Sequence, residues 1–336
     1  MDPTRPPHPA LSVLEGRSFL TLRDQSRETL EALIDLALQM KSGAVNQALL
    51  AGKTLGMLFT VPSTRTRISF QVAARQLGAH AEHLTPADLQ MSNHETLQDT
   101  AAVMGRLLDG IVVRLYDLTQ YGKGYRSLEE IGRYAAKPVI NALDDREHPC
   151  QVLADILTLR ERFGADYRQR TVVFSWAWAK RQKSPGVTHS MLAAAAILGM
   201  RLRMVFPPGF EPEEDYLRFA REQSERSGGS LELCHDLDTA SAGADAIYAK
   251  SWKALSCTAE EDAALRAPLR EAWRVSERHF ERAAPGAVFM DCMPLIRGDE
   301  ATAGVVDGPQ SIRYDQAENR LHIQKAILAS VLGSQP

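Results

Sequence analysis

Cysteine is scarce in this 336-residue sequence, and the four present are widely scattered. They are Cys150, Cys234, Cys257 and Cys292. No two of them form a CxxC pair, so the pattern indicates neither a zinc site nor a disulfide framework. Isolated cysteines are typical of a reducing compartment, and we expect a cytoplasmic protein.

Long hydrophobic runs are also missing. No stretch approaches the roughly 18 apolar residues that a membrane-spanning helix needs, so we expect no membrane partner. The N-terminal MDPTRPPHPALS is rich in proline and polar residues and lacks the apolar run of a signal peptide. The sequence therefore predicts a disordered lead-in over residues 1–16.

Neither sign of charge dominates. The net charge is −3, from 39 basic and 42 acidic residues, which gives no reason to expect nucleic acid or an anionic membrane as a partner. A G-x-G-x-x-G or G-x-x-x-x-G-K-[ST] loop after the first predicted strand is lacking, which argues against a nucleotide-binding protein. Any anion site must therefore be local and of another kind.

Short apolar runs alternate with amphipathic segments in both halves of the chain, and its length suits two domains of about 150 residues each. This alternation predicts an α/β fold with two doubly wound parallel sheets. Predicted strands are 54–60, 110–116, 137–143, 171–176, 201–206, 244–249 and 287–292. Ligands of such sheets bind beyond the carboxyl ends of the strands, which selects the loops worth examining.

The stretch PSTRTR, residues 62–67, follows the first predicted strand and opens a predicted helix. Ser63 is placed to cap that helix, whose first turn offers unpaired N–H groups and the positive end of the helix dipole. Arg65 and Arg67 oppose this dipole unless an anion lies between them and the backbone, and guanidinium groups bind phosphate bidentately. The pattern predicts a phosphate site. The alternative is a capped helix whose arginines pair with surface carboxylates.

Two further segments follow predicted strands. HPCQ opens a helix, so that His148 and Gln151 face the same sheet edge as Ser63. A neutral histidine and an amide suit a carbonyl and its amino group, although a lone histidine there is more often a capping or core residue. Cys292, in DCMP after the last strand, is either a buried apolar cysteine or a functional one.

Together these segments resemble the aspartate/ornithine carbamoyltransferase superfamily. The resemblance depends on S-x-R-T-R after the first strand, H-P-x-Q opening the helix toward the second domain, and a C-[LM]-P turn late in the chain. The motifs occur in order at compatible separations, over roughly residues 17 to 333. Three ordered motifs are far more specific than any one of them.

The resemblance implies carbamoyl transfer without a metal or another cofactor, by a homotrimer with active sites between subunits. Carbamoyl phosphate binds the first domain, expected over residues 17–148 with the C-terminal helix 316–333. The small amine substrate binds the second domain, expected over residues 149–315. Carbamoyl phosphate and this amine are the expected partners.

The resemblance and the loop positions assign the site residues. The expected catalytic residues are His148, Cys292 and Arg65. Those expected to bind carbamoyl phosphate are Ser63, Thr64, Arg65, Thr66, Arg114, His148, Gln151 and Arg320, with Gln90 resembling a loop residue that a neighbouring subunit inserts. Those expected to bind the amine are Lys250, Asp144, Asp291, Cys292, Met293 and Leu295.

The segment YAKSWKAL, residues 248–255, bears on the identity of the amine. Ornithine carbamoyltransferases usually carry a D-x-x-x-S-M-G loop there. This segment instead resembles the N-acetylornithine and N-succinylornithine carbamoyltransferases, whose second domain is knotted, as do AWAKRQKSPGVTHS and NRLHIQKAI. Lys250 is then expected to contact the substrate carboxylate. A solvent-facing lysine beside a packed Trp252 is the alternative.

Other features do not fit that subfamily. LTPADLQMSNHETLQDTA has the length and glutamine position of the ornithine enzymes and lacks the tryptophan that the acylornithine enzymes insert. Asp291 replaces the histidine of H-C-L-P, where it either orients a substrate ammonium or raises the pKa of the thiol. Glu300 stands where the acetylornithine enzymes carry a lysine, and either attracts a cationic group or forms an internal salt bridge.

Asp144, Asp145 and Glu147 cluster just ahead of His148, where they either steer a cationic amine or form a solvated turn. We rank an N-acylated ornithine or related derivative first as the substrate, free ornithine second and another amine third. A non-catalytic relative that only binds carbamoyl phosphate is a different class of function. The motifs beside the phosphate arginines are complete, which argues against it.

Overall fold

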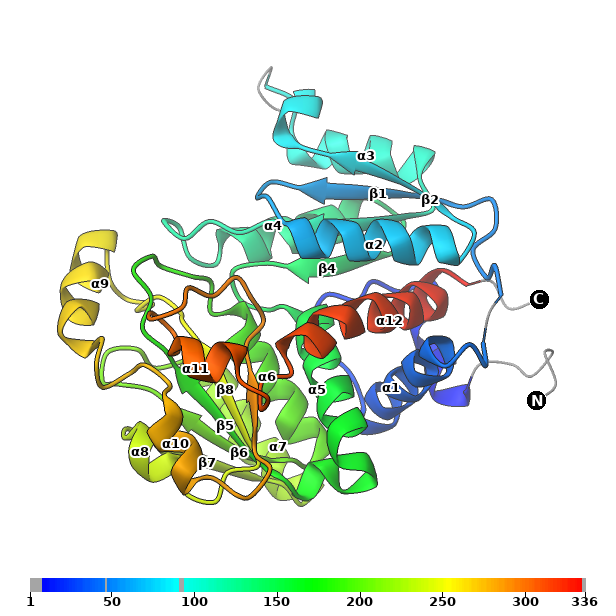
Figure 1. The fold of residues 1–336 in the computed structure, drawn as a ribbon. Helices are drawn as coiled ribbons and strands as arrows, with labels where there is room; N and C mark the ends of the chain where they lie inside the picture. The colour runs from blue at the N-terminus through cyan, green and yellow to red at the C-terminus, as the bar shows by residue number, and fades with distance from the viewer. Residues whose placement is uncertain (1–7, 46, 91–93, 334–336) are drawn as a thin grey trace. The chain divides into compact units, whose positions relative to one another are not determined.

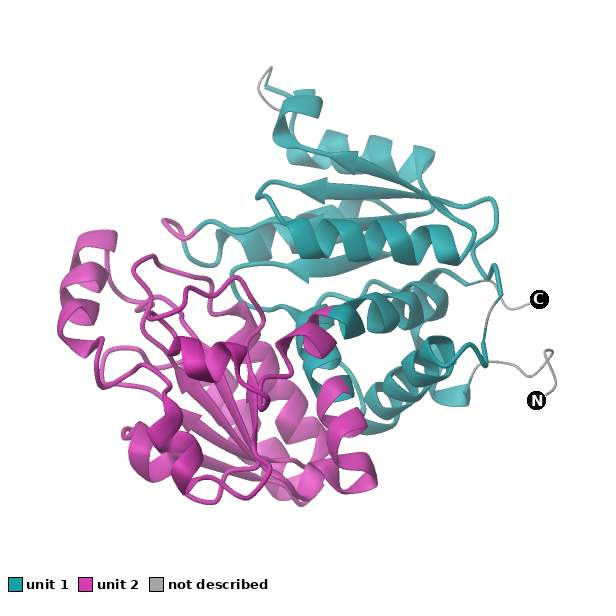
Figure 2. Ribbon diagram, in the orientation of Figure 1, with its two compact units in different colours: residues 1–117, 121–157, 318–336 teal, residues 118–120, 158–317 magenta. Residues whose placement is uncertain are grey.

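The computed structural model describes residues 8–45, 47–90 and 94–333 of the chain (Figure 1). The chain divides into two compact units (Figure 2). Unit 1 comprises residues 1–117, 121–157 and 318–336, and unit 2 comprises residues 118–120 and 158–317. Among the described helices, none has the length and apolar character needed to cross a bilayer.

Unit 1 is built on a four-stranded parallel sheet with the order β2-β1-β3-β4. Its strands are β1 (Thr54–Phe59), β2 (His80–Leu84), β3 (Gly110–Arg114) and β4 (Val139–Leu143). β3 and β4 are buried along their whole length, as expected of parallel strands covered on both faces. β2 lies at an edge of the sheet and is only partly buried.

The other secondary-structure elements in the described part of this unit are helices. They are η1 (Pro9–Leu14), α1 (Arg27–Lys41), α2 (Thr64–Gln76), η2 (Pro86–Asp88), α3 (Leu97–Leu107), α4 (Lys123–Tyr134), the first part of α5 (Pro149–Phe163) and most of α12 (Arg313–Leu332). The C-terminal α12 is joined to α1 by a hydrogen bond from Lys41 Nζ to Asn319 Oδ1 of 2.8 Å. The last helix of the chain therefore belongs largely to the first unit.

Unit 2 is built on a five-stranded parallel sheet with the order β7-β6-β5-β8-β9. Its strands are β5 (Thr171–Trp176), β6 (Arg201–Val205), β7 (Ser230–Cys234), β8 (Ala246–Lys250) and β9 (Val288–Met290). Its helices are η4 (Gly164–Gln169), α6 (Gly186–Leu198), α7 (Glu214–Ser227), α8 (Leu237–Ala240), α9 (Ala259–Arg266), η5 (Ala267–Leu269), α10 (Glu277–Arg282) and α11 (Ala303–Asp307). Every residue of α6 is buried, since this helix is apolar nearly all round.

The predicted fold class, two α/β domains on parallel sheets, is confirmed. The seven predicted strands all occur, most of them one to three residues shorter than expected. Parallel pairing puts the carboxyl ends of neighbouring strands at one edge of each sheet, where the candidate site residues follow. The knot in the second domain remains a prediction.

One expectation for the N-terminus is wrong over part of its length. Residues 9–14, inside the segment expected to be disordered, form the short helix η1, whereas residues 1–7 lie outside the described part. Leu11 and Leu14 are buried on one face of η1, and His8 Nδ1 accepts a hydrogen bond from Ala10 N at 3.2 Å. These two apolar side chains and the cap order a segment whose composition alone resembles a linker.

Candidate functional site

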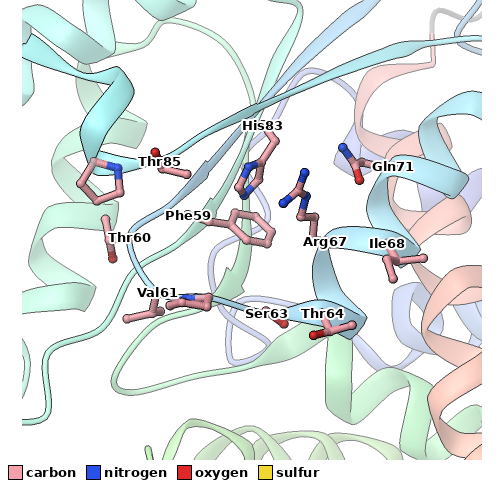
Figure 3. A pocket seen from close by; sticks show the side chains of 12 residues that line it. Phe59, Thr60, Val61, Ser63, Thr64, Arg67, Ile68, Gln71, His83 and Thr85 are labelled. Carbon is pink, nitrogen blue, oxygen red and sulfur yellow. The ribbon is translucent and has the colours of Figure 1, made fainter.

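The residues of PSTRTR lie in unit 1, at the turn from β1 into α2 (Figure 3). Ser63 is the N-cap of α2, as predicted, and its Oγ accepts a hydrogen bond from Thr66 N at 3.2 Å. Thr64 is exposed at the first helical position. The first turn of α2 therefore presents backbone N–H groups and the positive end of the helix dipole at the carboxyl edge of the sheet.

Thr66 Oγ1 accepts hydrogen bonds from two side chains, one of which comes from a distant part of the chain. It accepts one hydrogen bond from Ser63 Oγ at 2.8 Å and another from Arg320 Nη2 on α12. Thr66 is fully buried and Arg320 is 3 % exposed. The fold thus brings an arginine 254 residues away in sequence to the start of α2.

Two more arginines belong to the same sheet edge. Arg65 is half-buried in the first turn of α2, and its Nε makes no hydrogen bond to any described residue. Arg114 ends β3 in register with Phe59, the last residue of β1. Guanidinium groups and a helix N-terminus at the ends of adjacent strands make a cationic cradle suited to a phosphate group.

His148 and Gln151 stand at the start of α5, after β4. The backbone oxygen of His148 accepts hydrogen bonds from Gln151 N and Val152 N, so His148 precedes the first turn as its cap. His148 is 5 % exposed and Gln151 is 1 % exposed. Gln151 Nε2 donates to Asp155 Oδ1 at 2.7 Å, which fixes the amide and leaves its oxygen as the acceptor for a ligand.

The acidic cluster before His148 is not the solvated turn that one alternative predicted, because Asp144, Asp145 and Glu147 are all buried. Asp144 accepts hydrogen bonds from Asn141 Nδ2 and from the backbone N–H groups of residues 146 and 147. Asp145 accepts from two N–H groups at the start of α4, and Glu147 from Leu22 N at 3.0 Å. Burial raises the pKa of Asp144 well above its ordinary value. These carboxylates shape the turn that presents His148.

A pocket of about 610 Å³ lies at the β1–α2 turn, on residues of unit 1 alone (Figure 3). It is lined by Phe59, Thr60, Val61, Pro62, Ser63, Thr64, Arg67, Ile68, Gln71, His83, Thr85 and Pro86. In Figure 3 the side chains of Arg67 and His83 point toward one another. The pKa of His83 is lowered mainly by burial and in second place by the positive charge of Arg67. Ile68 is 55 % exposed beside this pocket, so an apolar surface remains uncovered on the single chain.

Lys250 is central to a second group of residues, in unit 2. It ends β8 and is 6 % exposed, so the alternative of a solvent-facing lysine is wrong. Its Nζ donates to Ser184 O at 3.2 Å and to Ser251 O. Burial lowers the pKa of Lys250 to about 8, although the Cys292 side chain, through the charge of its thiolate, opposes this shift. A cation is thus held beyond the carboxyl end of a central strand.

Glu300 forms an internal salt bridge, the second of the two roles open to it from sequence. It is fully buried and pairs with Lys183 Nζ, while its Oε2 accepts a hydrogen bond from Ile296 N at 2.9 Å. Lys183 also donates to Pro294 O at 2.7 Å. Lys183 therefore joins the loop after β5 to the loop after β9.

Asp291 follows β9 and is 3 % exposed. Its Oδ1 accepts a hydrogen bond from Met293 N, and its own N–H donates to Gln316 Oε1 at 3.1 Å. Burial raises the pKa of Asp291 to about 6, against the lowering effect of Lys183. The carboxylate closes the turn that carries Cys292, and Cys292, Met293 and Leu295 are each half-buried.

The structure thus sorts the predicted residues into two sets. Those expected to hold carbamoyl phosphate gather in unit 1, and those expected to hold the amine gather in unit 2, except Asp144, which lies in unit 1.

Gln90 is exposed, and the neighbouring positions 91–93 lie outside the described residues. Sequence reasoning did not single out Lys183, whose only signal was its place in the long loop after a predicted strand.

Two family models match the chain. One is the aspartate/ornithine carbamoyltransferase, carbamoyl-P binding domain, over residues 17–161. The other is the aspartate/ornithine carbamoyltransferase, Asp/Orn binding domain, over residues 173–331. Together they cover nearly the whole chain, in the order that the motifs predicted.

Individual relatives agree with the family models. The anabolic ornithine carbamoyltransferase of Pyrococcus furiosus is 39 % identical over 324 residues, which cover 95 % of this chain and 98 % of that protein. A solved structure of ornithine carbamoyltransferase from Pyrococcus furiosus superposes with a TM-score of 0.84 at 38 % identity, covering 96 % of this chain and 98 % of that one. A structure of acetylornithine transcarbamylase complexed with acetylcitrulline has a TM-score of 0.88 at 36 % identity, covering 95 % of this chain and all of the other.

Proposed function

The chain belongs to the aspartate/ornithine carbamoyltransferase family and is a carbamoyltransferase, and from this premise we propose that its amine substrate is an N-acylated ornithine. The products are then an N-acylated ureido amino acid and phosphate. Unit 1 binds carbamoyl phosphate and unit 2 binds the amine.

In this proposal the cradle of unit 1 holds the phosphate group. Its hydrogen-bond donors are the N–H groups at the start of α2, which Ser63 caps, and the hydroxyl group of Thr64. Its cations are Arg65, Arg114 and Arg320. The contact of Arg320 with Thr66 supports this role, because it orients a hydroxyl group and places a charge at the same point.

The carbamoyl group is held by the start of α5 and by Thr66. His148 and the Thr66 hydroxyl group polarise the carbonyl oxygen, and the Gln151 amide oxygen accepts a hydrogen bond from the carbamoyl nitrogen. The neutral amine of the substrate forms a bond to the carbonyl carbon. The bond from that carbon to the phosphate oxygen then breaks, phosphate keeps the electron pair, and the departing phosphate takes the proton that the attacking nitrogen loses. Positioning and electrostatics suffice for this reaction.

The observation on which the N-acyl preference rests is the buried ammonium of Lys250. A cation at this position attracts the substrate carboxylate and repels the α-ammonium of free ornithine. Acylation converts that ammonium to a neutral amide and removes the repulsion. Glu300 already pairs with Lys183, so it could balance the α-ammonium of free ornithine only by giving up part of that buried ion pair.

Free ornithine is the second candidate. Curated relatives at 38 to 41 % identity are named ornithine carbamoyltransferases. The sequence around Gln90 also resembles that of the ornithine enzymes in length. The buried carboxylate of Asp291 favours this candidate if it receives the α-ammonium. A direct comparison of substrates separates the two.

We expect the purified enzyme to form ureido product from carbamoyl phosphate and N-acetylornithine or N-succinylornithine at a kcat/KM at least tenfold above that for ornithine. The reason is the repulsion between Lys250 and an α-ammonium, which at an effective dielectric constant of about 20 amounts to a few kcal/mol at contact distance. The measurement is a colorimetric ureido assay on these three amines with putrescine, lysine and aspartate as controls. A higher kcat/KM for free ornithine would replace the N-acyl assignment with the second candidate.

We also propose that the chain assembles as a homotrimer. Ile68 beside the pocket of unit 1, and Val103 and Leu107 one turn apart on α3, are exposed apolar side chains that a neighbouring subunit would cover. Light scattering should give about three times the 37.1 kDa chain mass. Ile68→Asp should lower this mass because it buries a charge without a partner, whereas Val13→Asp on η1 should leave it unchanged. A wild-type mass of one chain would reject the trimer.

A further inference from the structure

Arg266, the last residue of α9, is a buried arginine with a complete set of partners. Its Nε and Nη2 form a bidentate ion pair with Asp262 one turn earlier, at 2.6 and 3.0 Å. Its Nη1 donates to Ala179 O at 3.0 Å and to Ser251 Oγ at 3.4 Å, and its Nη2 also donates to Trp252 O at 3.4 Å. All five N–H donors of the guanidinium group are therefore used.

The acceptors of Arg266 come from two loops that matter for the amine site. Ala179 lies in the loop after β5, and Ser251 and Trp252 lie in the loop after β8, directly beyond Lys250. β5 and β8 are hydrogen-bonded neighbours in the sheet. A single planar group thus links the loops that follow two adjacent strands. It does so beside two other hydrogen bonds, from Ala177 N to Lys250 O and from Trp176 Nε1 to Trp252 O, each of 3.0 Å.

Asp262 and the surrounding rings hold the guanidinium group in place. Asp262 is fully buried, and its Oδ1 also accepts a hydrogen bond from Ala254 N at 2.7 Å. The guanidinium carbon lies 5.6 Å from the Trp176 ring centroid and 5.4 Å from that of Phe210. The backbone oxygen of Arg266 accepts a bond from Trp178 Nε1 at 2.9 Å. Arg266 is therefore bonded to both loops, and Asp262 to the loop after β8.

Stability alone is a weak reason to keep a buried ion pair, because apolar residues of similar volume often serve as well. What apolar residues cannot do is present five donors in one plane. A lysine offers three donors from a single point and cannot reproduce the same arrangement. The requirement at this place is therefore for a defined loop geometry.

We propose that Arg266, supported by Asp262, is a positioning residue of the amine site. It sets the separation of residues 177–179 from residues 251–254 and thereby fixes the direction in which Lys250 presents its ammonium. Arg266 does not touch the substrate and acts through the backbone of these loops. The kinetic part of this inference rests on the proposed function, whereas the loop geometry does not.

The test compares Arg266→Met with Arg313→Met. Arg313 is a matched control in unit 2, since it is also buried, pairs with Asp307 at 3.0 Å and donates to Val306 O at 2.6 Å, without contacting either loop. Arg266→Met should raise the KM for the amine about tenfold and lower kcat by about 10²-fold, since misplacement by about 1 Å has effects of that size. The KM for carbamoyl phosphate should stay within twofold. Arg313→Met should change neither amine parameter.

Hydrogen exchange provides a readout that does not need an active enzyme. In Arg266→Met the amides of residues 177–179 and 251–254 should exchange faster than in wild type, and in Arg313→Met they should not. Arg266→Lys, which keeps the cation and some of the donors, should give an intermediate change in both exchange and KM, and it remains measurable if Arg266→Met folds poorly.

The outcomes separate the two claims. Unchanged exchange in these loops, or an unchanged KM and kcat for the amine in Arg266→Met, would overturn the positioning role, even if the melting temperature fell. The wild-type enzyme could turn over none of the tested amines while Arg266→Met still exchanged faster in these loops alone. That result would uphold the loop geometry and reject the proposed amine.

Discussion

Arg65→Ala should reduce kcat by about 10²- to 10³-fold, the loss typical of removing one preorganised donor to a developing charge. It should also raise the KM for carbamoyl phosphate, because Arg65 belongs to the cradle at the start of α2. Folding stability should change little. A cation in the first turn opposes the helix dipole, so its removal is neutral or stabilises the fold by about 0.3–1 kcal/mol.

The matched control is Arg75→Ala, the same substitution at an exposed position in the last turn of the same helix. It should leave both KM values and kcat unchanged. Steady-state kinetics with carbamoyl phosphate varied, together with a thermal melt, tests both variants. If Arg65→Ala retained wild-type kinetics, the phosphate would have to bind elsewhere in unit 1.

Lys250→Met should raise the KM for an N-acylated ornithine by roughly 10- to 150-fold, the equivalent of losing one charge-assisted hydrogen bond of about 1.5–3 kcal/mol. The KM for carbamoyl phosphate should not change. The preference over free ornithine should also fall, since the α-ammonium is no longer repelled. Methionine suits the position because Lys250 is buried and an apolar side chain needs no counter-charge.

Lys253→Met is a control for this variant. Lys253 is buried three residues later, and its Nζ donates to Leu118 O at 2.9 Å, outside the proposed substrate contacts. Its substitution should alter the melting temperature without altering the KM for the amine. Equal effects of the two substitutions on that KM would show that Lys250 acts only on packing.

The same lysine predicts a pH dependence. Burial lowers the pKa of Lys250 to about 8, so the ammonium predominates below pH 8 and is lost above it. The KM for the acylated amine should therefore rise as the pH increases through about 8. Lys250→Arg, which stays charged over this range, should move that rise to higher pH. A pH profile of the KM identical in both proteins would assign the titration to another group.

Much of unit 1 and unit 2 follows from local sequence patterns. The central strands are apolar runs because parallel strands covered on both faces are buried throughout, and this is why β3, β4, β5 and β8 were predicted. The edge strands β2 and β7, with the sequences HAEHL and SLELC, were missed. Each alternates in exposure and carries charged or polar side chains, so neither has the continuous apolar signal.

The sequence by itself determined the fold class, the order of the elements, the cap at Ser63 and the position of each candidate loop at a strand end. These features depend on residues close together in the chain, whose spacing is readable. Only the tertiary structure decided which charged groups meet. Arg320 reaches Thr66, Lys183 pairs with Glu300, and Arg266 joins two loops, across 254, 117 and up to 87 positions. The sequence around a charged side chain has no periodicity from which its distant partner could be predicted. Burial arises only when the elements pack, and it is burial that makes Lys250 and Asp144 internal groups.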